Sequence, residues 1–319
     1  MHESNTKAHA LVNNVQRKGA RLLLGICDID QANTEPPPCA ALIEANLKPA
    51  HVLRIMGLLR FWRIALSRDE SSILRQVWEV VESHAPITDM HSLNGEIHRL
   101  QQKYNDQIGD TVPNPKCKKE WKKLVDDISK QELHAWYKEH IRAAGRASAY
   151  AAIRHELVGK TPEYLTHIAL SKHERRNIAV MRTQCAAYVA AHAQHRETPL
   201  FGQHESHVQR YCQCKSCTPR TTDSTAHVML HCSTHKADRQ AMVSTVDRHL
   251  RAAARKPSHI QSLSELGSDT LKLQLLLGST HLLYLRNGSA EYGKILAASA
   301  AFIQSIHKDR WTQRRHTYG

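Results

Sequence analysis

Residues 48–68, KPAHVLRIMGLLRFWRIALSR, carry large apolar side chains on every side of a helix drawn through them. These side chains are Val52, Leu53, Ile55, Met56, Leu58, Leu59, Phe61, Trp62 and Ile64. The arginines Arg54, Arg60 and Arg63 point in different directions and define no basic face. A helix that is apolar all round is typically buried or packed on both faces. The stretch therefore predicts a helix inside a helical core.

Helical periodicity continues on both sides of this stretch. Residues 8–27 predict a helix that ends near Gly25, before a loop that contains three prolines. Residues 71–83 predict a capped amphipathic helix with one apolar stripe, formed by Ile73, Leu74, Val77, Trp78 and Val81. Residues 117–145 predict a long helix whose inward side is Trp121, Leu124, Val125, Ile128, Leu133 and Trp136.

The rest of the chain repeats this pattern. Pro162 begins a helix in TPEYL, and further helices are expected at 171–195, 237–256, 262–278 and from there to about Trp311. Strand signals and internal repeats are not evident. We therefore predict an all-α fold, an irregular multi-helix arrangement with a small zinc knuckle inserted in it.

Turn-forming residues divide the chain into four expected segments. GDTVPNPK, residues 109–116, is the first candidate boundary. The expected segments are 1–108 and 116–205, both helical, 206–240 with the cysteines, and 241–319 with the last helices.

Composition and charge limit the partners and the compartment. Of the 319 residues, 44 are Lys or Arg and 30 are Asp or Glu, which gives a net charge of +14 and makes a polyanion the first partner to consider. No apolar run approaches the roughly 18 residues of a membrane span, and the N-terminus lacks the pattern of a signal peptide. We expect an intracellular protein, nuclear or cytoplasmic, without a membrane partner. In a reducing compartment, clustered cysteines are more often metal ligands than disulfides.

A cysteine and histidine cluster occupies YCQCKSCTPRTTDSTAHVMLHC, residues 211–232. Cys214 and Cys217 form a C-x2-C pair, which supplies two thiolates from one tight turn, and His227 and Cys232 follow in the order C-x2-C-x9-H-x4-C. This spacing predicts a CCHC zinc knuckle. Two alternatives stay open, because Cys212 could replace Cys217 as a C-x-C pair with Cys214, and His231 could replace Cys232 as the last ligand. Cys27, Cys39, Cys117 and Cys185 have no partner at ligand spacing and are expected to be free thiols.

The order of several short blocks resembles a known family. VQRKGARLLLG, EWKKLVDDI, TPEYL, NIAVMRT and then CQCKSC with HVMLHC resemble the region after the polymerase core in reverse transcriptases of non-LTR (LINE-type) retrotransposons. The resemblance implies thumb-like and linker helices, then a CCHC zinc segment that contacts nucleic acid during target-primed reverse transcription. It implies Cys214 (or Cys212), Cys217, His227 and Cys232 as zinc ligands. Three cysteines before the histidine depart from the simplest family spacing.

The residues of polymerase chemistry are not recognisable. Two Mg²⁺ ions need paired carboxylates, and the single Asp-Asp pair, Asp126 and Asp127, lies in a lysine-rich segment that predicts a solvated helix face. Residues 154–161 end like a phosphate-binding loop but begin with Arg154 where that loop needs glycine. We expect no catalytic activity from this chain, which resembles a detached C-terminal portion, from a truncated gene model or a degenerate copy.

Basic residues beside the knuckle predict contacts with RNA or DNA, either an element transcript or a target site. The candidates are Lys215, Arg220, Lys236, Arg239, Arg248, Arg251 and Arg255. Arg248, Arg251 and Arg255 have the spacing i, i+3 and i+7, which predicts one helix face. Tyr211 is the one aromatic residue close enough in sequence to stack on a base.

Other functions remain open at this point. The chain could work with a polymerase palm supplied in trans, or it could be an inert relic. It could also be a helical protein-interaction module in which zinc is purely structural.

Overall fold

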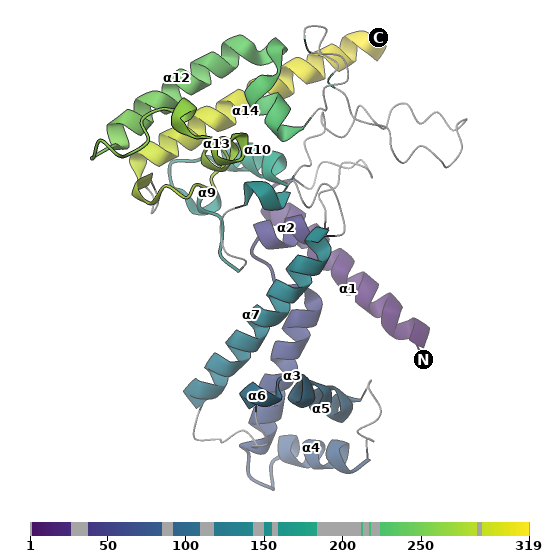
Figure 1. Ribbon diagram of the computed structural model, residues 1–319. Helices are drawn as coiled ribbons and strands as arrows, with labels where there is room; N and C mark the ends of the chain where they lie inside the picture. The colour runs from purple at the N-terminus through teal and green to yellow at the C-terminus, as the bar shows by residue number, and fades with distance from the viewer. Residues whose placement is uncertain are drawn as a thin grey trace. The chain divides into compact units, whose positions relative to one another are not determined.

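The computed structural model describes residues 2–26, 38–84, 92–108, 118–142, 150–154, 159–183, 212, 217, 224–285 and 289–318. Helices account for all regular structure in these residues and no strand occurs among them, so the predicted all-α fold is confirmed. The longer helices are α1 (His2–Leu23), α3 (Ala50–Leu66), α4 (Ile73–His84), α5 (Leu93–Lys103), α7 (Lys118–Arg142), α10 (Lys172–Arg182), α12 (Lys236–Ala253) and α14 (Ala290–Tyr318) (Figure 1). The short ones are α2 (Pro38–Glu44), α6 (Asn105–Ile108), α9 (Glu163–Thr166) and α13 (Asp269–Leu276).

The chain forms two compact units, each with its own core. The first consists of Met1–Asn13 and Lys48–Lys138, and the second of Asn14–Leu47 and Glu139–Gly319. The four segments expected from the sequence stay predictions. Residues 109–116 and, apart from Cys212 and Cys217, residues 184–223 lie outside the described part of the chain.

In the first unit α3 packs against α7 through two tryptophans. The Trp121 indole meets the Trp62 ring edge-on at a centroid distance of 5.6 Å and donates its N–H to the carbonyl of Leu59 over 3.2 Å. Burial follows one stripe of α3, formed by Val52, Ile55, Met56, Leu59, Trp62 and Ala65. The prediction of all-round burial was wrong, because Leu53 and Ile64 expose 48% and 39% of their surface.

Helix α4 departs further from its predicted pattern. Trp78 is its one buried residue, whereas Ile73, Leu74 and Val77, which were predicted to face the core, are exposed by 76%, 38% and 45%. Within this unit α4 packs on α3 and α5. Periodicity shows which side chains share a face, but a neighbouring element has to cover that face to bury it. In α7 four of the six side chains predicted to face inward, Trp121, Val125, Ile128 and Leu133, are buried, and the other two, Leu124 and Trp136, are half-buried.

In the second unit α14 lies beside α12 (Figure 1) and also packs on α10. Tyr292, Ile295, Leu296 and Ile303 of α14 are fully buried. The segment after α9 approaches α14 at Gly293, where an added Cβ would lie 2.4 Å from Cε1 of His167. Since real Cβ contacts are never this short, the close approach requires glycine at this position.

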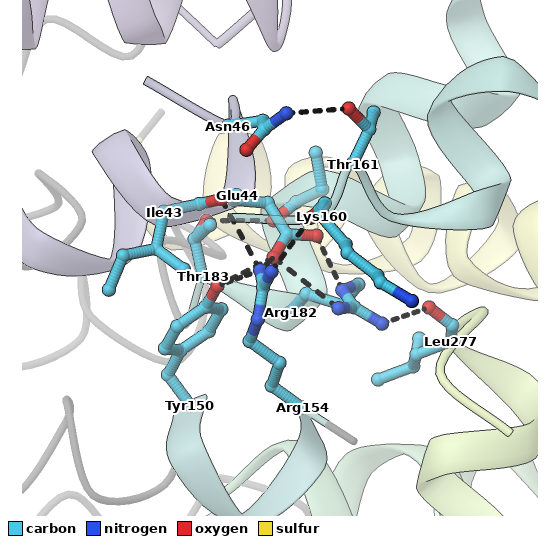
Figure 2. A network of polar contacts seen from close by, with 11 residues as sticks. Ile43, Glu44, Asn46, Tyr150, Arg154, Lys160, Thr161, Arg182, Thr183 and Leu277 are labelled. Atoms are coloured by element: carbon cyan, nitrogen blue, oxygen red, sulfur yellow. Dashed lines mark hydrogen bonds and ion pairs between the residues drawn. The ribbon is translucent and has the colours of Figure 1, made fainter. Parts of the chain in front are cut away.

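A buried ionic network joins four segments of this unit (Figure 2). Glu44, at the end of α2, accepts from Nε of Arg182 over 2.5 Å and from Nη1 of Arg154 over 3.2 Å, and both ion-paired side chains are at most 1% exposed. The Tyr150 hydroxyl donates to the same carboxylate over 2.7 Å. Burial and the neighbouring Glu44 charge raise the pKa of Tyr150 well above its usual value, so its hydroxyl keeps its proton.

Main-chain carbonyls take up the remaining donors of the two guanidinium groups. Arg182 donates to the Leu277 carbonyl over 2.9 Å, and Arg154 donates to the carbonyls of Lys160 and Ile43 over 3.0 and 3.3 Å. Because a buried charge without partners is costly, these bonds make the burial of two arginines and one glutamate tolerable. The arrangement therefore fixes the relative positions of α2, α10 and the segments that carry Arg154 and Leu277.

Removing the Glu44 carboxylate should destabilise the second unit strongly. Glu44→Ala leaves two buried guanidinium groups without a counter-charge, and breaking a buried pair in this way costs about 3–5 kcal/mol. The control is Glu79→Ala, which removes the exposed pair with Arg75 on α4 and should cost less than about 0.5 kcal/mol. Urea unfolding followed by circular dichroism measures both. Equal losses for the two variants would contradict a stabilising role of the network.

Candidate metal centre and the basic helix beside it

Cys212, Cys217, His227 and Cys232 form a cluster that could hold a metal ion. Each offers one ligand atom, and all four atoms lie within 4.8 Å of one another. The Sγ of Cys232 lies 3.9 Å from the Sγ of Cys212 and 3.9 Å from that of Cys217. The Sγ of Cys217 is 3.6 Å from Nε2 of His227. Four donor atoms thus surround one point.

A π-helical turn, His227–His231, brings the last two of these residues together. The N–H of Cys232 donates to the carbonyl of His227 over 2.7 Å, so the turn closes one residue later than an α-helical turn would. At its start, the N–H of His227 donates to Oγ of Ser224 over 3.1 Å. Cys232 is fully buried and His227 is 7% exposed, so the turn holds both ligands away from solvent.

Polar groups around the cluster favour thiolates. Burial opposes ionisation of Cys217, but hydrogen bonds to Ser233, Cys212 and Cys232 outweigh it and lower the pKa of this thiol below its ordinary value. The Oγ of Ser233 lies 3.2 Å from the Cys217 sulfur. Because metal ions bind the thiolate and not the thiol, this environment prepares Cys217 as a ligand.

Arg239, in the first turns of α12, also supports the cluster. Its Nη1 donates to the carbonyl of Cys232 over 2.7 Å. Burial lowers the pKa of Arg239, while nearby charge on Cys232 and Cys217 acts in the opposite direction. The sequence had suggested Arg239 as a nucleic-acid contact. That role stays a prediction, while in the structure its guanidinium fastens the end of the π-helical turn to α12.

The structure brings together three of the predicted ligands, Cys217, His227 and Cys232, and adds Cys212, which had been an alternative. Cys214 lies outside the described residues. His231, the other alternative, is directed away from the sulfurs, and its Nε2 lies 2.5 Å from Oδ2 of Asp269 on α13. An α-helical turn would have placed His231 beside His227, but the wider turn gives that place to Cys232.

The predicted nucleic-acid residues divide between the surface and the cluster. Lys236, Arg248 and Arg251 are exposed on α12, while Met242, Val246 and Leu250 of the same helix are buried against the core. Arg255 is exposed too, but α12 ends at Ala253, so the predicted common helix face with Arg248 and Arg251 was wrong. The helix ends there because the backbone turns extended at Ala254, with a ψ of 108°. Lys215 and Arg220 lie outside the described part of the chain.

The Asp-Asp pair lies in the other unit, on α7. The carboxylate of Asp127 pairs with Nζ of Lys130 one turn later over 3.0 Å, and 41% of its side chain is exposed. Both aspartates belong to one helix, as the sequence indicated. Ser233 and Asp269 were missed as neighbours of the cluster. The spacing of cysteine and histidine could not identify them. Ser233 contributes a hydroxyl and is not a ligand type, and Asp269 lies 37 positions after Cys232 on another helix.

The amount of metal bound per chain should depend on the four clustered residues and not on His231. Cys217→Ser and Cys212→Ser should each lose the bound metal ion, because a hydroxyl is a far weaker ligand than a thiolate. His231→Ala is the matched control and should keep it, since His231 is turned toward Asp269. Elemental analysis of purified protein gives the metal content per chain. Loss of metal in His231→Ala, or full retention in Cys212→Ser, would show that another ligand set is used.

The sequence matches no known family model, no curated protein and no solved structure. Among the described residues, no helix combines the length and the apolar character needed to span a bilayer. The cysteine and histidine cluster and the basic helix that follows it are therefore the features on which a function can be based.

Proposed function

We propose that the four-residue cluster binds Zn²⁺ as a structural ion. Three thiolates and one imidazole are the donor set that zinc prefers in closed structural sites. With bonds of about 2.3 Å to sulfur and about 2.0 Å to nitrogen, a regular tetrahedron separates two sulfurs by about 3.8 Å and a sulfur and a nitrogen by about 3.5 Å. The observed separations of 3.9, 3.9 and 3.6 Å support this geometry.

A closed site of this kind acts on folding and leaves no position for a substrate. With four protein ligands zinc has no open coordination position, so its contribution is to order the segment that it binds. Cys232 is the last ligand, and α12 begins four positions later at Lys236. The ion would therefore pin Cys212 and Cys217 to the π-helical turn at the beginning of α12.

The exposed face of α12 is proposed to bind nucleic acid. Lys236, Arg248 and Arg251 are exposed on this helix, on the side away from the buried stripe. The chain as a whole carries a net charge of +14, which favours a polyanionic partner. In the described part of the chain none of these three side chains forms a salt bridge, so phosphates are the natural counter-charges. The observation that carries the proposal is that α12 begins at the metal cluster with Lys236 and carries two more exposed cations, Arg248 and Arg251, about 18–22 Å further along the same helix.

The resemblance to non-LTR retrotransposon reverse transcriptases gives this function a context. We propose that the chain is a non-catalytic C-terminal portion of such an enzyme, which holds the element RNA or the target DNA during target-primed reverse transcription. The polymerase palm, carried elsewhere, would be its protein partner. An inert relic would retain the zinc cluster but bind no nucleic acid.

A protein-interaction module is the second candidate. Its support is the exposed apolar stripe of α4, where Ile73, Val77 and Val80 expose 76%, 45% and 56% of their surface. In that case zinc is structural only, and substitutions of the basic residues of α12 do not change the affinity for the protein partner. Nucleic-acid binding separates the two functions.

Binding to single-stranded RNA or DNA should weaken steeply with salt. Each neutralised phosphate contributes about 0.7 to the slope of log affinity against log salt on a single strand. The double change Arg248→Ala with Arg251→Ala should therefore lower the slope by about 1.4. Fluorescence anisotropy with a labelled oligonucleotide at several salt concentrations measures it.

The matched control removes the same charge elsewhere. Lys118 and Lys119 are exposed at the start of α7, in the other unit, and Lys118→Ala with Lys119→Ala should leave the slope unchanged. If the two double variants lose the same slope, the charge acts nonspecifically and the assignment to α12 fails. If wild-type protein binds no oligonucleotide at low salt, the protein-interaction function is favoured.

A further inference from the structure

Two aromatic rings stack in the loop region that follows α12. The rings of His259 and Tyr284 have a centroid separation of 4.2 Å and an interplanar angle of 11°, so they lie nearly parallel. Both residues are half-buried, and Tyr284 also packs against the hydrophobic core of the unit, so His259 is the outer ring of the pair. His259 comes six positions after the end of α12, and Tyr284 belongs to the short 3-10 turn Leu283–Leu285.

Hydrogen bonds hold both rings in place. The Tyr284 hydroxyl donates to the carbonyl of Ile260 over 2.8 Å. Nδ1 of His259 accepts from the N–H of Arg255 over 3.2 Å, and its own backbone N–H donates to the carbonyl of Lys256 over 3.0 Å. The ring pair is therefore a pre-ordered flat surface, and a ligand that stacks on it loses little side-chain entropy.

Exposed cations flank His259 in the sequence. Arg255 and Lys256 are both exposed and belong to the same tight turn as His259, and Arg251 lies in the last turn of α12. Glu265 is the acidic group near Tyr284. Its carboxylate accepts from the N–H of Gln261 over 3.0 Å and from the Ser262 hydroxyl over 2.9 Å, so its charge is held by its own loop. The turn thus offers an aromatic surface beside exposed positive charges.

We propose that the His259–Tyr284 pair is a stacking site for an unpaired nucleobase, with the adjacent phosphates bound by Arg255 and Lys256. This combination of an aromatic surface and a basic track is how proteins bind single strands without sequence preference. In a duplex the base faces are covered by their neighbours, so the site selects single-stranded nucleic acid. The inference rests on the proposed nucleic-acid function of α12 and extends it from phosphate binding to base binding.

The test compares two oligomers with equal charge. One is an oligothymidine of about 12 nucleotides, within the site size of such proteins, and the other is an abasic oligomer of the same length. Because stacking adds to the phosphate contacts, wild-type protein should bind the base-bearing strand roughly tenfold more tightly. His259→Leu keeps an apolar side chain but removes the π-face and should abolish this preference. His173→Leu, at an exposed position of α10, makes the same chemical change away from the site and should keep it.

Two further measurements guard against a folding defect. Tyr284→Phe keeps the ring and removes only its hydroxyl, so it should retain the preference, and metal content with circular dichroism reports on the fold of each variant. In wild-type protein, a strand that contains 5-iodouracil should crosslink on irradiation to His259 or Tyr284. Crosslinks confined to other residues would overturn the site.

The outcomes separate this inference from the proposed function. Equal affinity for base-bearing and abasic strands, or an unchanged preference in His259→Leu, overturns the stacking site while phosphate binding by α12 stands. If the wild-type protein binds neither strand, the proposed function fails, and the stacking site fails with it. An oligouridine series, scored in the same way, shows whether the site takes RNA as well as DNA.

Discussion

The packing of the second unit depends on one carboxylate in its interior. Glu44 is fully buried and pairs with two arginines, Arg182 and Arg154, that approach from segments far along the chain (Figure 2). Three buried charges are tolerated only when the ion pairs have good geometry and the remaining polar atoms are hydrogen-bonded. The elements that carry these charges therefore have few alternative positions. The Leu277 carbonyl accepts from Nη1 of Arg182, and the next residue, Gly278, has a φ of +80° and would meet Tyr164 at 2.9 Å if it carried a Cβ. The loop after α13 is thereby held against the same network.

The metal cluster is attached to this core through its own π-helical turn. Val228 and Met229, the two residues after His227, are fully buried in the same hydrophobic cluster as Met242 and Val246 of α12. The turn therefore contributes both to the core and to the ligand set. Arg239 adds a second link, from α12 to the carbonyl of Cys232. As a result, the position of the candidate ligand residues and the position of α12 are coupled.

The sequence predicted the helices well and their surroundings less well. Spacing of apolar residues located α3, α7, α12 and α14 because the helical period is a local property. It could not show that one face of α4 stays exposed in the described part of its unit, or that Arg255 lies beyond the end of α12. At the candidate site, spacing identified Cys217, His227 and Cys232. Cys212 and not His231 joins these three residues. This depends on the π-helical turn, which is wider than an α-helical one, and on the contact of His231 with Asp269, and the spacing of the ligands predicts neither.

The amino-acid sequence by itself determined the all-α class, the concentration of cysteine and histidine in one segment and the excess of positive charge, because each follows from composition or local spacing. Only the tertiary structure decided which charged residues are buried. Glu44, Tyr150, Arg154 and Arg182 carry no distinguishing mark in the sequence, and their partners lie 106 to 138 positions from Glu44. The same holds for the stacked pair His259 and Tyr284. Desolvation and stacking depend on which distant groups surround a side chain, and only the folded chain brings those groups together.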